Sequence, residues 1–190
     1  MATAGARILI NAAGIQRYGT VETTDERVWN EVLAVNVTSI FLFAKHLVPL
    51  MRTAGGGSIV NVSSVQAFVT QTDVVAYAAS KGAINALTRA IAVDHAHEQI
   101  RCNAVCPGSV DTPMLRASAE RFAGDRDPAD LLGDWGRAHP LGRMAGPGEV
   151  AEACAFLAGP RSAFVTGSEM RVDGGLTAAA GVTLPTDERN

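Results

Sequence analysis

The sequence predicts an α/β protein in which a parallel β-sheet carries helices on both faces. Apolar, strand-like runs alternate along the chain with longer stretches of helical periodicity, an order typical of parallel sheets. The strand-like runs are almost continuously apolar, as expected for strands that are covered on both sides. The turns NAAG, NVSS, VCPG and VDGG follow these runs, at the strand ends where such sheets bind ligands. We therefore predict one domain over residues 1–190 with a site at that edge.

The first half of the chain is expected to form two strands and one long helix. Residues 7–11 (RILIN) are a β-branched run that ends in the turn AAG. Thr and Asp in TTDERV precede an apolar pattern of period 3.6, which is how a capped helix begins, and the pattern continues over residues 25–52. The stretch TAGGG ends this helix, and SIVNV (58–62) is the second strand.

The second half continues the alternation and adds an irregular segment. Residues 113–146 mix charges, glycine and proline, and we expect them to form a mobile excursion, with one or two short helices, that borders the substrate. Pro147 lies in the first turn of a further helix, PGEVAEACAFLAG. The other expected elements are a helix over 75–98, a strand over 100–105 that Pro107-Gly108 ends, and a strand over 168–172.

Composition excludes several classes of protein. With 47% hydrophobic and 18% charged residues the chain can bury a core, and no uninterrupted apolar run has the length of a membrane-spanning helix. The N-terminus MATAGARILI lacks the pattern of a secretion signal. A net charge of −3 with scattered Lys and Arg argues against nucleic acid as the main partner.

The cysteines and histidines indicate a reduced, metal-free protein. Cys102, Cys106 and Cys154 contain no C-x-x-C, so we expect buried thiols and a cytoplasmic location, with a metal site or a disulfide as the alternative. The four histidines show no ligand spacing, and we expect them on helix faces or in solvent. No metal site is predicted.

The stretch YAASK is the first candidate for chemistry. It places Tyr77 and Lys81 four positions apart, hence on one helix face. A phenol titrates near about 10, and a neighbouring cation favours the phenolate and lowers that pKa. Ser64 precedes Tyr77 at a distance that lets a loop bring its hydroxyl back to the phenol. The alternatives are a tyrosine that only packs in the core, and Ser63 in the place of Ser64.

Six ordered motifs resemble the short-chain dehydrogenase/reductase family across essentially the whole chain. They are NAAG (11–14), Asn36 in LAVNVTS, GSIVNVSS (57–64), YAASK (77–81), IRCNAVCPGSVDTPM (100–114) and VTGSEMRVDGG (165–175). The resemblance implies a partial Rossmann-like, doubly wound parallel sheet that corresponds to the C-terminal half of the family fold. It also implies an NAD- or NADP-dependent oxidoreductase that transfers hydride between a nicotinamide and a small alcohol or carbonyl compound.

The resemblance assigns a role to each member of a catalytic set. Tyr77 exchanges a proton with the reacting oxygen, Lys81 lowers the pKa of Tyr77 and binds the nicotinamide ribose, and Ser64 donates a hydrogen bond to the same oxygen. Asn36 holds a water that links Lys81 to solvent, or alternatively is only a polar group that bends its helix. The implied cofactor contacts are Asn11, Ala12, Ala13, Gly14, Tyr77, Lys81, Pro107, Gly108, Val110 and Thr112.

One part of the family pattern has no counterpart in this sequence. The family's T-G-x-x-x-G-x-G turn, which binds the cofactor pyrophosphate, does not precede RILIN, and Ala12 replaces the second Asn of N-N-A-G. We therefore expect a chain that lacks the N-terminal, glycine-rich half and binds NAD or NADP weakly. It is either part of a longer enzyme or a cofactor-poor structural or regulatory subunit. Apolar helix faces and the strand edge at 7–11 predict a homo-oligomer, a dimer or tetramer.

Overall fold

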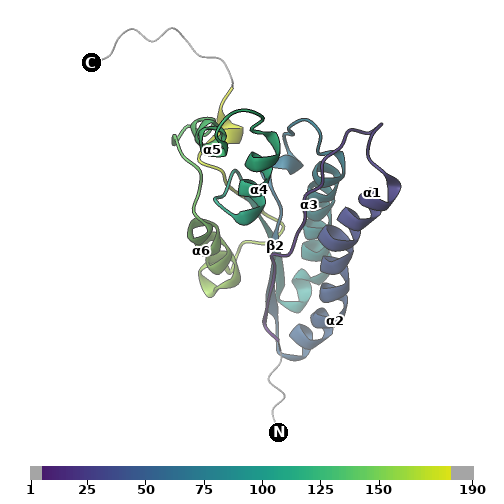
Figure 1. Cartoon of the computed structure of the whole chain (residues 1–190). Coiled ribbons are helices and arrows are strands. Elements are labelled where there is room, and N and C mark those ends of the chain that lie inside the picture. The colour runs from purple at the N-terminus through teal and green to yellow at the C-terminus, as the bar shows by residue number, and fades with distance from the viewer. Residues whose placement is uncertain (1–5, 181–190) are drawn as a thin grey trace, which may run out of the picture.

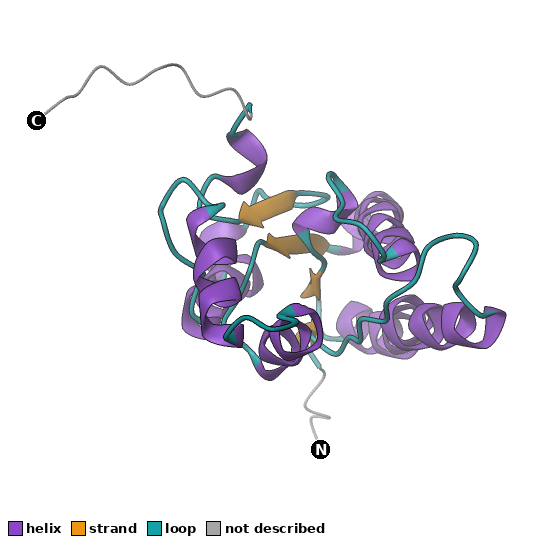
Figure 2. Ribbon diagram, turned by 45° about the horizontal axis from the view of Figure 1, so that its top comes forward, coloured by secondary structure: helices purple, strands orange, loops and turns teal. Residues whose placement is uncertain are grey.

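The computed structural model of the chain describes residues 6–180 and contains a four-stranded parallel sheet. Its strands are β1 (Ile8–Asn11), β2 (Gly57–Val62), β3 (Ile100–Pro107) and β4 (Glu169–Val172). They lie side by side in the order β1-β2-β3-β4, and every neighbouring pair is parallel. Figure 2 shows the strands between two layers of helices. The predicted α/β architecture and all four predicted strands are confirmed.

Helices cover both faces of the sheet (Figure 1). One face carries α1 (Glu26–Leu33), α2 (Ser39–Thr53) and α3 (Val75–His95), and the other carries α6 (Pro147–Ala158). Strand periodicity divides the core between the two layers. Ile59 packs with the α2 and α3 side chains, whereas its neighbour Val60 packs with Leu157 and Cys154 of α6. The central strands β2 and β3 are thus buried on both sides, whereas β1 leaves Ile8 and Ile10 exposed.

The predicted helix over 25–52 exists, but a π-helical turn interrupts it. Asp25 caps its start by accepting a hydrogen bond from the backbone N–H of Arg27 at 2.7 Å. The π turn spans Ala34–Thr38 and contains Asn36, which is fully buried. Such turns are rare and occur often at functional sites. The helix therefore changes geometry at the residue that the family pattern singles out.

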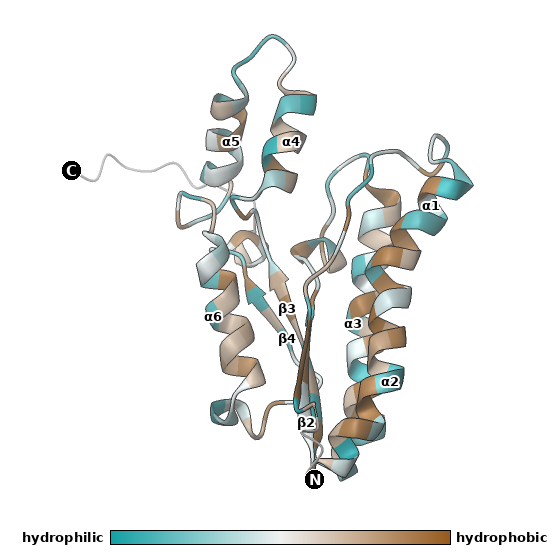
Figure 3. Cartoon of the chain, turned by 60° about the horizontal axis from the view of Figure 1, so that its bottom comes forward, coloured by the Kyte–Doolittle hydropathy of each residue, from teal (hydrophilic) through white to brown (hydrophobic). Residues whose placement is uncertain are grey.

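The outer face of α2 is apolar and exposed. Ile40, Ala44, Val48 and Met51 point into the core, while the opposite face leaves four large side chains in solvent: Phe41, Leu42, Phe43 and Leu50. Figure 3 shows this apolar character along α2 and its neighbour α3. By length and composition the stretch Glu26–Thr53 could cross a membrane, a test that core helices of soluble proteins also pass.

The irregular segment between β3 and α6 forms the two predicted short helices. They are α4 (Pro113–Phe122) and α5 (Pro128–Arg137), which lie beyond the carboxyl ends of the strands (Figure 1). Thr112 caps α4 and Asp127 caps α5, and a proline opens each helix. We call this pair the lid. Its mobility stays a prediction.

The three cysteines are buried and free, as expected. Burial raises the pKa of Cys102 to about 12 and that of Cys106 to about 11, so both thiols stay protonated at neutral pH. In the described part of the chain, no three His, Cys, Asp or Glu side chains are grouped so as to hold a metal ion.

Candidate active site

The candidate residues meet at the carboxyl end of the sheet, around a cavity of about 440 Å³. Ser64 follows β2, Tyr77 and Lys81 lie in the first turns of α3, and the segment after β3 closes a further side. The lid contributes the wall opposite the sheet, through side chains of α4 and α5. Three of the four predicted catalytic side chains, Ser64, Tyr77 and Lys81, line this cavity.

Lys81 is almost completely buried, with 4% of its surface exposed. Its Nζ donates a hydrogen bond to the carbonyl oxygen of Val62 at 3.0 Å and lies 5.2 Å from the centroid of the Tyr77 ring. Burial lowers the pKa of Lys81 to about 8, because the charged ammonium loses hydration. An ammonium has three donors, so the bond to Val62 leaves Nζ two further protons.

The pKa of Tyr77 moves in the opposite direction from the sequence-based expectation. Burial raises it above its usual value, and the neighbouring Ser64 hydroxyl only partly offsets that rise. The expected lowering by Lys81 is wrong for the free chain, because the loss of hydration on burial is the largest influence on this pKa. The phenol of the free chain is therefore held protonated.

The structure distinguishes the two serines that follow β2. The hydroxyl of Ser63 donates to the backbone carbonyl of Lys81 at 3.1 Å, which ties β2 to α3. The hydroxyl of Ser64 caps a short helical turn by accepting from the N–H of Gln66, and it is close enough to Tyr77 to affect its pKa. A hydroxyl that accepts one bond still has a proton to donate. Ser64 therefore fits the predicted role better than Ser63.

Asn36 joins three segments through its amide group. Its Oδ1 accepts from the N–H of Ile15 at 2.8 Å, and its Nδ2 donates to the carbonyl of Ile15 and to the hydroxyl of Ser80. Ser80 in turn donates to the carbonyl of Tyr77. Both amide protons are thus engaged, so Asn36 fixes the loop after β1 against the start of α3. Its predicted role in holding a water stays a prediction.

With this geometry in place, comparison with known proteins identifies the family. Residues 3–177 match the family described as enoyl-(acyl carrier protein) reductase. The chain is 40% identical over 169 residues to dehydrogenase/reductase SDR family member 6 of Xenopus laevis, which covers 88% of this chain and 68% of that protein. The chain belongs to the short-chain dehydrogenase/reductase family.

Other family members show the same extent of similarity. The chain is 42% identical to inactive 2-(S)-hydroxypropyl-CoM dehydrogenase 2 of Xanthobacter autotrophicus, over 90% of this chain and 73% of that protein. The ligand-free aldohexose dehydrogenase of Thermoplasma acidophilum superposes with a TM-score of 0.92 and 39% identity, covering 96% of this chain and 72% of that one. A gluconate 5-dehydrogenase from Burkholderia cenocepacia, in complex with NADP and tartrate, gives a TM-score of 0.84 and 33% identity, covering 94% of this chain and 68% of that one.

The motif NAAG, at the end of β1 in this family member, divides into structural and cavity-lining residues. Ala12 and Gly14 line the cavity. Asn11 is buried and its amide donates to Oδ1 of Asn61 at 2.8 Å, which links β1 to β2, and Ala13 is not part of the cavity wall. A Cβ at Gly14 would lie 3.7 Å from Nζ of Lys81. The absent side chain therefore leaves the buried ammonium open toward the cavity.

The segment Pro107–Thr112 contributes mainly backbone to the cavity wall. The backbone N–H of Asp111 donates to the carbonyl of Ala145, and the N–H of Ala145 donates to the carbonyl of Ser109. These two bonds form a parallel β-bridge that pairs Val110 with Ala145. In such a bridge the N–H and C=O of Val110 point away from Ala145. The carbonyl accepts from the hydroxyl of Thr112 at 3.3 Å. Pro107, Gly108, Val110 and Thr112 all line the cavity, as the family resemblance implies.

Two cavity residues have no signal in the sequence. His139, expected on a helix face or in solvent, is buried: its Nε2 accepts from the N–H of Ser109 at 3.1 Å and its Nδ1 donates to the carbonyl of Trp135. A Cβ on Gly108 would lie 2.7 Å from that Nε2, so only glycine fits there. The histidine spacing gives no hint of this contact, because it depends on how the lid folds back.

Tyr18 is the second such residue. Its hydroxyl bonds to the hydroxyl of Ser118 on α4, and its ring meets the Phe122 ring edge-on at 4.7 Å. The adjacent Gly19 exchanges backbone hydrogen bonds with Asp73 and Val75, at the start of α3. The loop after β1 is therefore held against both the lid and the helix that carries Tyr77. No local pattern marks Tyr18, since its partners lie about a hundred residues away in the chain.

Proposed function

We propose that the chain carries the chemical centre of an NAD- or NADP-dependent oxidoreductase that interconverts a small alcohol and its carbonyl compound. The observation that carries the proposal is the convergence of Ser64, Tyr77 and Lys81 on one cavity that has open backbone groups at its edge. Each of these side chains lies where a reacting oxygen and a nicotinamide ribose could both be reached. Family membership supports the reaction type.

Tyr77 is the proposed proton donor. Its raised pKa keeps the phenol protonated across the neutral range, which is the state that gives a proton to a carbonyl oxygen. Ser64 donates a hydrogen bond to the same oxygen and holds it beside the phenol. Negative charge that develops on the oxygen is thereby stabilised by two donors. In the reverse direction the phenolate would accept the proton of an alcohol, which requires its pKa to be brought down.

The described residues fit the nicotinamide end of a cofactor. A nicotinamide cofactor supplies the hydride of this reaction. Lys81 has two donors left for vicinal ribose hydroxyls, and Gly14 leaves the path to them open. Val110 presents main-chain groups that suit a carboxamide. Lys81 would thus bind the ribose and keep a positive charge near Tyr77.

The phosphate end of the cofactor has less support. Among the described residues around the cavity, no cationic side chain besides Lys81 is present to meet a pyrophosphate. We therefore propose that the 190-residue chain binds NAD and NADP weakly, at sub-millimolar affinity or worse. Isothermal titration calorimetry with NADH and NADPH tests this proposal, and low-micromolar binding of either would contradict it. The choice between the two cofactors and the preferred direction stay open.

Activity is tested with millimolar NADH or NADPH and a panel of small ketones and aldehydes, by following the absorbance of the reduced nicotinamide. Turnover that Tyr77→Phe abolishes supports the proposal. A chain with the correct fold that converts no member of the panel would favour the alternative, a structural or regulatory subunit.

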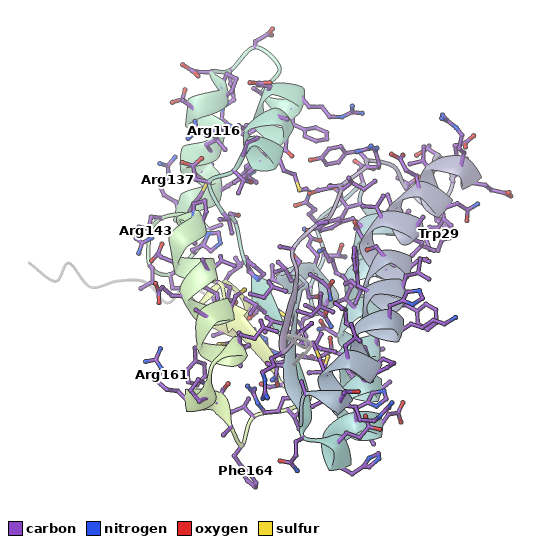
Figure 4. The ribbon with its side chains drawn as sticks, turned by 90° about the horizontal axis from the view of Figure 1, so that it is seen from below. Trp29, Arg116, Arg137, Arg143, Arg161 and Phe164 are labelled. Atoms are coloured by element: carbon purple, nitrogen blue, oxygen red, sulfur yellow. The ribbon has the colours of Figure 1, made fainter. Side chains whose placement is uncertain are left out.

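Self-association is a further part of the proposal. The exposed apolar side chains of α2 form a surface of the kind that marks an interaction site. Phe164, near β4, is also fully exposed (Figure 4). Among the described residues, β1 is an edge strand of the sheet, and it carries the exposed Ile8 and Ile10. We expect a dimer or larger homo-oligomer in solution. Light scattering that finds a stable 19.8 kDa particle at micromolar concentration would contradict this.

A further inference from the structure

We infer that the substrate of this site is uncharged: a neutral alcohol or ketone, without a carboxylate, sulfonate or phosphate group in the cavity. The inference deepens the proposed function and rests on it for the reaction type. Its basis is the charge and hydrogen bonding of the cavity wall, which are independent of the assignment of Tyr77 as proton donor.

Lys81 is the one charged side chain among the described residues that line the cavity. Its ammonium lies beside the Tyr77 ring and is bonded to the carbonyl of Val62. Under the proposed function its remaining protons bind the cofactor. An anionic group of the substrate would therefore find no free cation inside the cavity.

His139 does not supply a second cation. Its Nε2 accepts a hydrogen bond from the backbone N–H of Ser109, which requires a lone pair on that nitrogen. Its Nδ1 then carries the proton and donates it to the carbonyl of Trp135. Both bonds suit the neutral ring, because a proton on Nε2 would face the N–H of Ser109, and both groups would then be donors.

The arginines near the lid are directed elsewhere. Arg116 pairs with Asp111 at 2.7 Å, and Arg137 pairs with Asp134 (Figure 4). Arg121 is exposed and lies over the rings of Tyr18 and Phe122, with its guanidinium carbon 5.2 Å from the Tyr18 centroid. It is not part of the cavity wall. Because Tyr18 and Phe122 line the cavity, this cation could compete with the inference and is tested by substitution.

The remaining wall carries no charge, and its polar members, which include Gln16, Gln66 and Gln71, are neutral. Met114, Leu115, Phe122 and Trp135 form an apolar surface on the lid side. The hydroxyl of Ser118 donates to its own helix backbone and bonds to Tyr18. A buried anion needs a countercharge to offset its lost hydration, and the described part of this wall offers none beyond Lys81. A neutral, compact apolar body with one alcohol or carbonyl group meets no such cost.

The test uses ketones in matched pairs that differ in charge: methyl pyruvate with pyruvate, and methyl 4-acetylbenzoate with 4-acetylbenzoate. Turnover is measured with millimolar NADH or NADPH. Binding is measured separately, with oxidised cofactor, from the fluorescence of Trp135 in a Trp29→Phe background, because Trp29 is the other tryptophan and lies on α1 (Figure 4). We expect each ester to exceed its carboxylate by at least about tenfold in kcat/KM and in affinity.

Two variants sharpen the comparison. Met114→Lys puts a cation on the lid side of the cavity and should shift the preference toward the carboxylates, whereas the control Met114→Leu should leave it unchanged. Arg121→Gln should not alter the ester preference. If the carboxylates bind or react as well as their esters, the inference is overturned but the proposed oxidoreductase activity is not. If carboxylates are preferred and Arg121→Gln removes that preference, the inference is overturned and Arg121 is identified as the residue that binds the anionic group.

The remaining outcomes separate the inference from the proposed function. If the esters quench Trp135 fluorescence but are not reduced, and the carboxylates do not quench it, the site binds an uncharged ligand but the proposed reaction is refuted. No binding and no conversion of any compound overturns both.

Discussion

Replacing Lys81 by methionine should stabilise the free chain while it removes a residue that the proposed function requires. Burial lowers the pKa of Lys81 from 10.5 to about 8. At about 1.36 kcal/mol per pH unit, the folded state holds the ammonium at a cost of roughly 3 kcal/mol. Methionine matches the length of the side chain and carries no charge. Loss of the hydrogen bond to Val62 costs about 0.5–1.5 kcal/mol, so we expect a net gain of about 1–3 kcal/mol at pH 7.

The pH dependence gives this prediction its sign. Between pH 8 and 10.5 the unfolded chain keeps the Lys81 proton more often than the folded chain does. The contribution of Lys81 to the unfolding free energy therefore rises with pH across this window. Below pH 8 Lys81 is charged in both the folded and the unfolded chain, so the full cost of burying the ammonium remains. Above pH 10.5 Lys81 is neutral in both states, and this cost disappears. The advantage of Lys81→Met should accordingly be largest below pH 8 and shrink as the pH rises.

The assay is urea unfolding of the wild type and the variant at several pH values from 7 to 10. Comparing the two chains removes the contributions of tyrosines and cysteines that titrate in the same range. Lys45→Met is the matched control, since Lys45 is the other lysine of the sequence and is exposed on α2. It should change stability little at any pH. If Lys81→Met destabilises the chain, or if its advantage does not shrink with pH, the buried ammonium is not a cost to the fold.

Three further predictions test the site and its supports. Tyr77→Phe should reduce turnover at least about a hundredfold with an unchanged circular dichroism spectrum, because the ring still packs and only the proton is lost; retention of a tenth of the wild-type rate would refute the assignment. Tyr18→Phe should speed hydrogen exchange in α4, and adding Ser118→Ala should cause little extra change, since both substitutions remove the hydrogen bond between Tyr18 and Ser118. Fully additive effects of the two substitutions on the exchange rates would contradict this shared contact. Gly108→Ala should destabilise the chain by about 1–3 kcal/mol through its clash with His139, whereas Gly82→Ala, with open space around it, should stabilise it by up to about 1 kcal/mol; equal thermal stability of the two would refute this.

Local chemistry explains why the sequence predicts the elements well. The four strands are short apolar runs between turn residues, and Asp25 and Pro147 mark the starts of their helices. The π turn at Ala34–Thr38 is different, because the hydrophobic period of the helix continues through it. The family resemblance marks Asn36 as unusual, but only the structure shows a change of helix geometry there.

The candidate site is predictable where its residues follow strand ends, and much less so where distant segments meet. Ser64 and Tyr77 reach the same cavity because parallel strands end at one edge of the sheet. Tyr18 and His139 depend on how the lid packs, which no local pattern encodes. The sequence predicts the wrong direction for the pKa of Tyr77 for a similar reason. Sequence spacing identifies the neighbouring cation, but it does not show the burial that outweighs it.

The proposed function requires that this cavity couples hydride transfer to proton exchange at Tyr77. The most direct test incubates the chain with millimolar nicotinamide cofactor that carries deuterium at the hydride position and with a neutral ketone. Mass spectrometry then follows the label. We predict an alcohol deuterated on its carbinol carbon, from one face of the cofactor ring only, and no product from Tyr77→Phe. An unlabelled alcohol, or equal labelling by wild type and Tyr77→Phe, would contradict it.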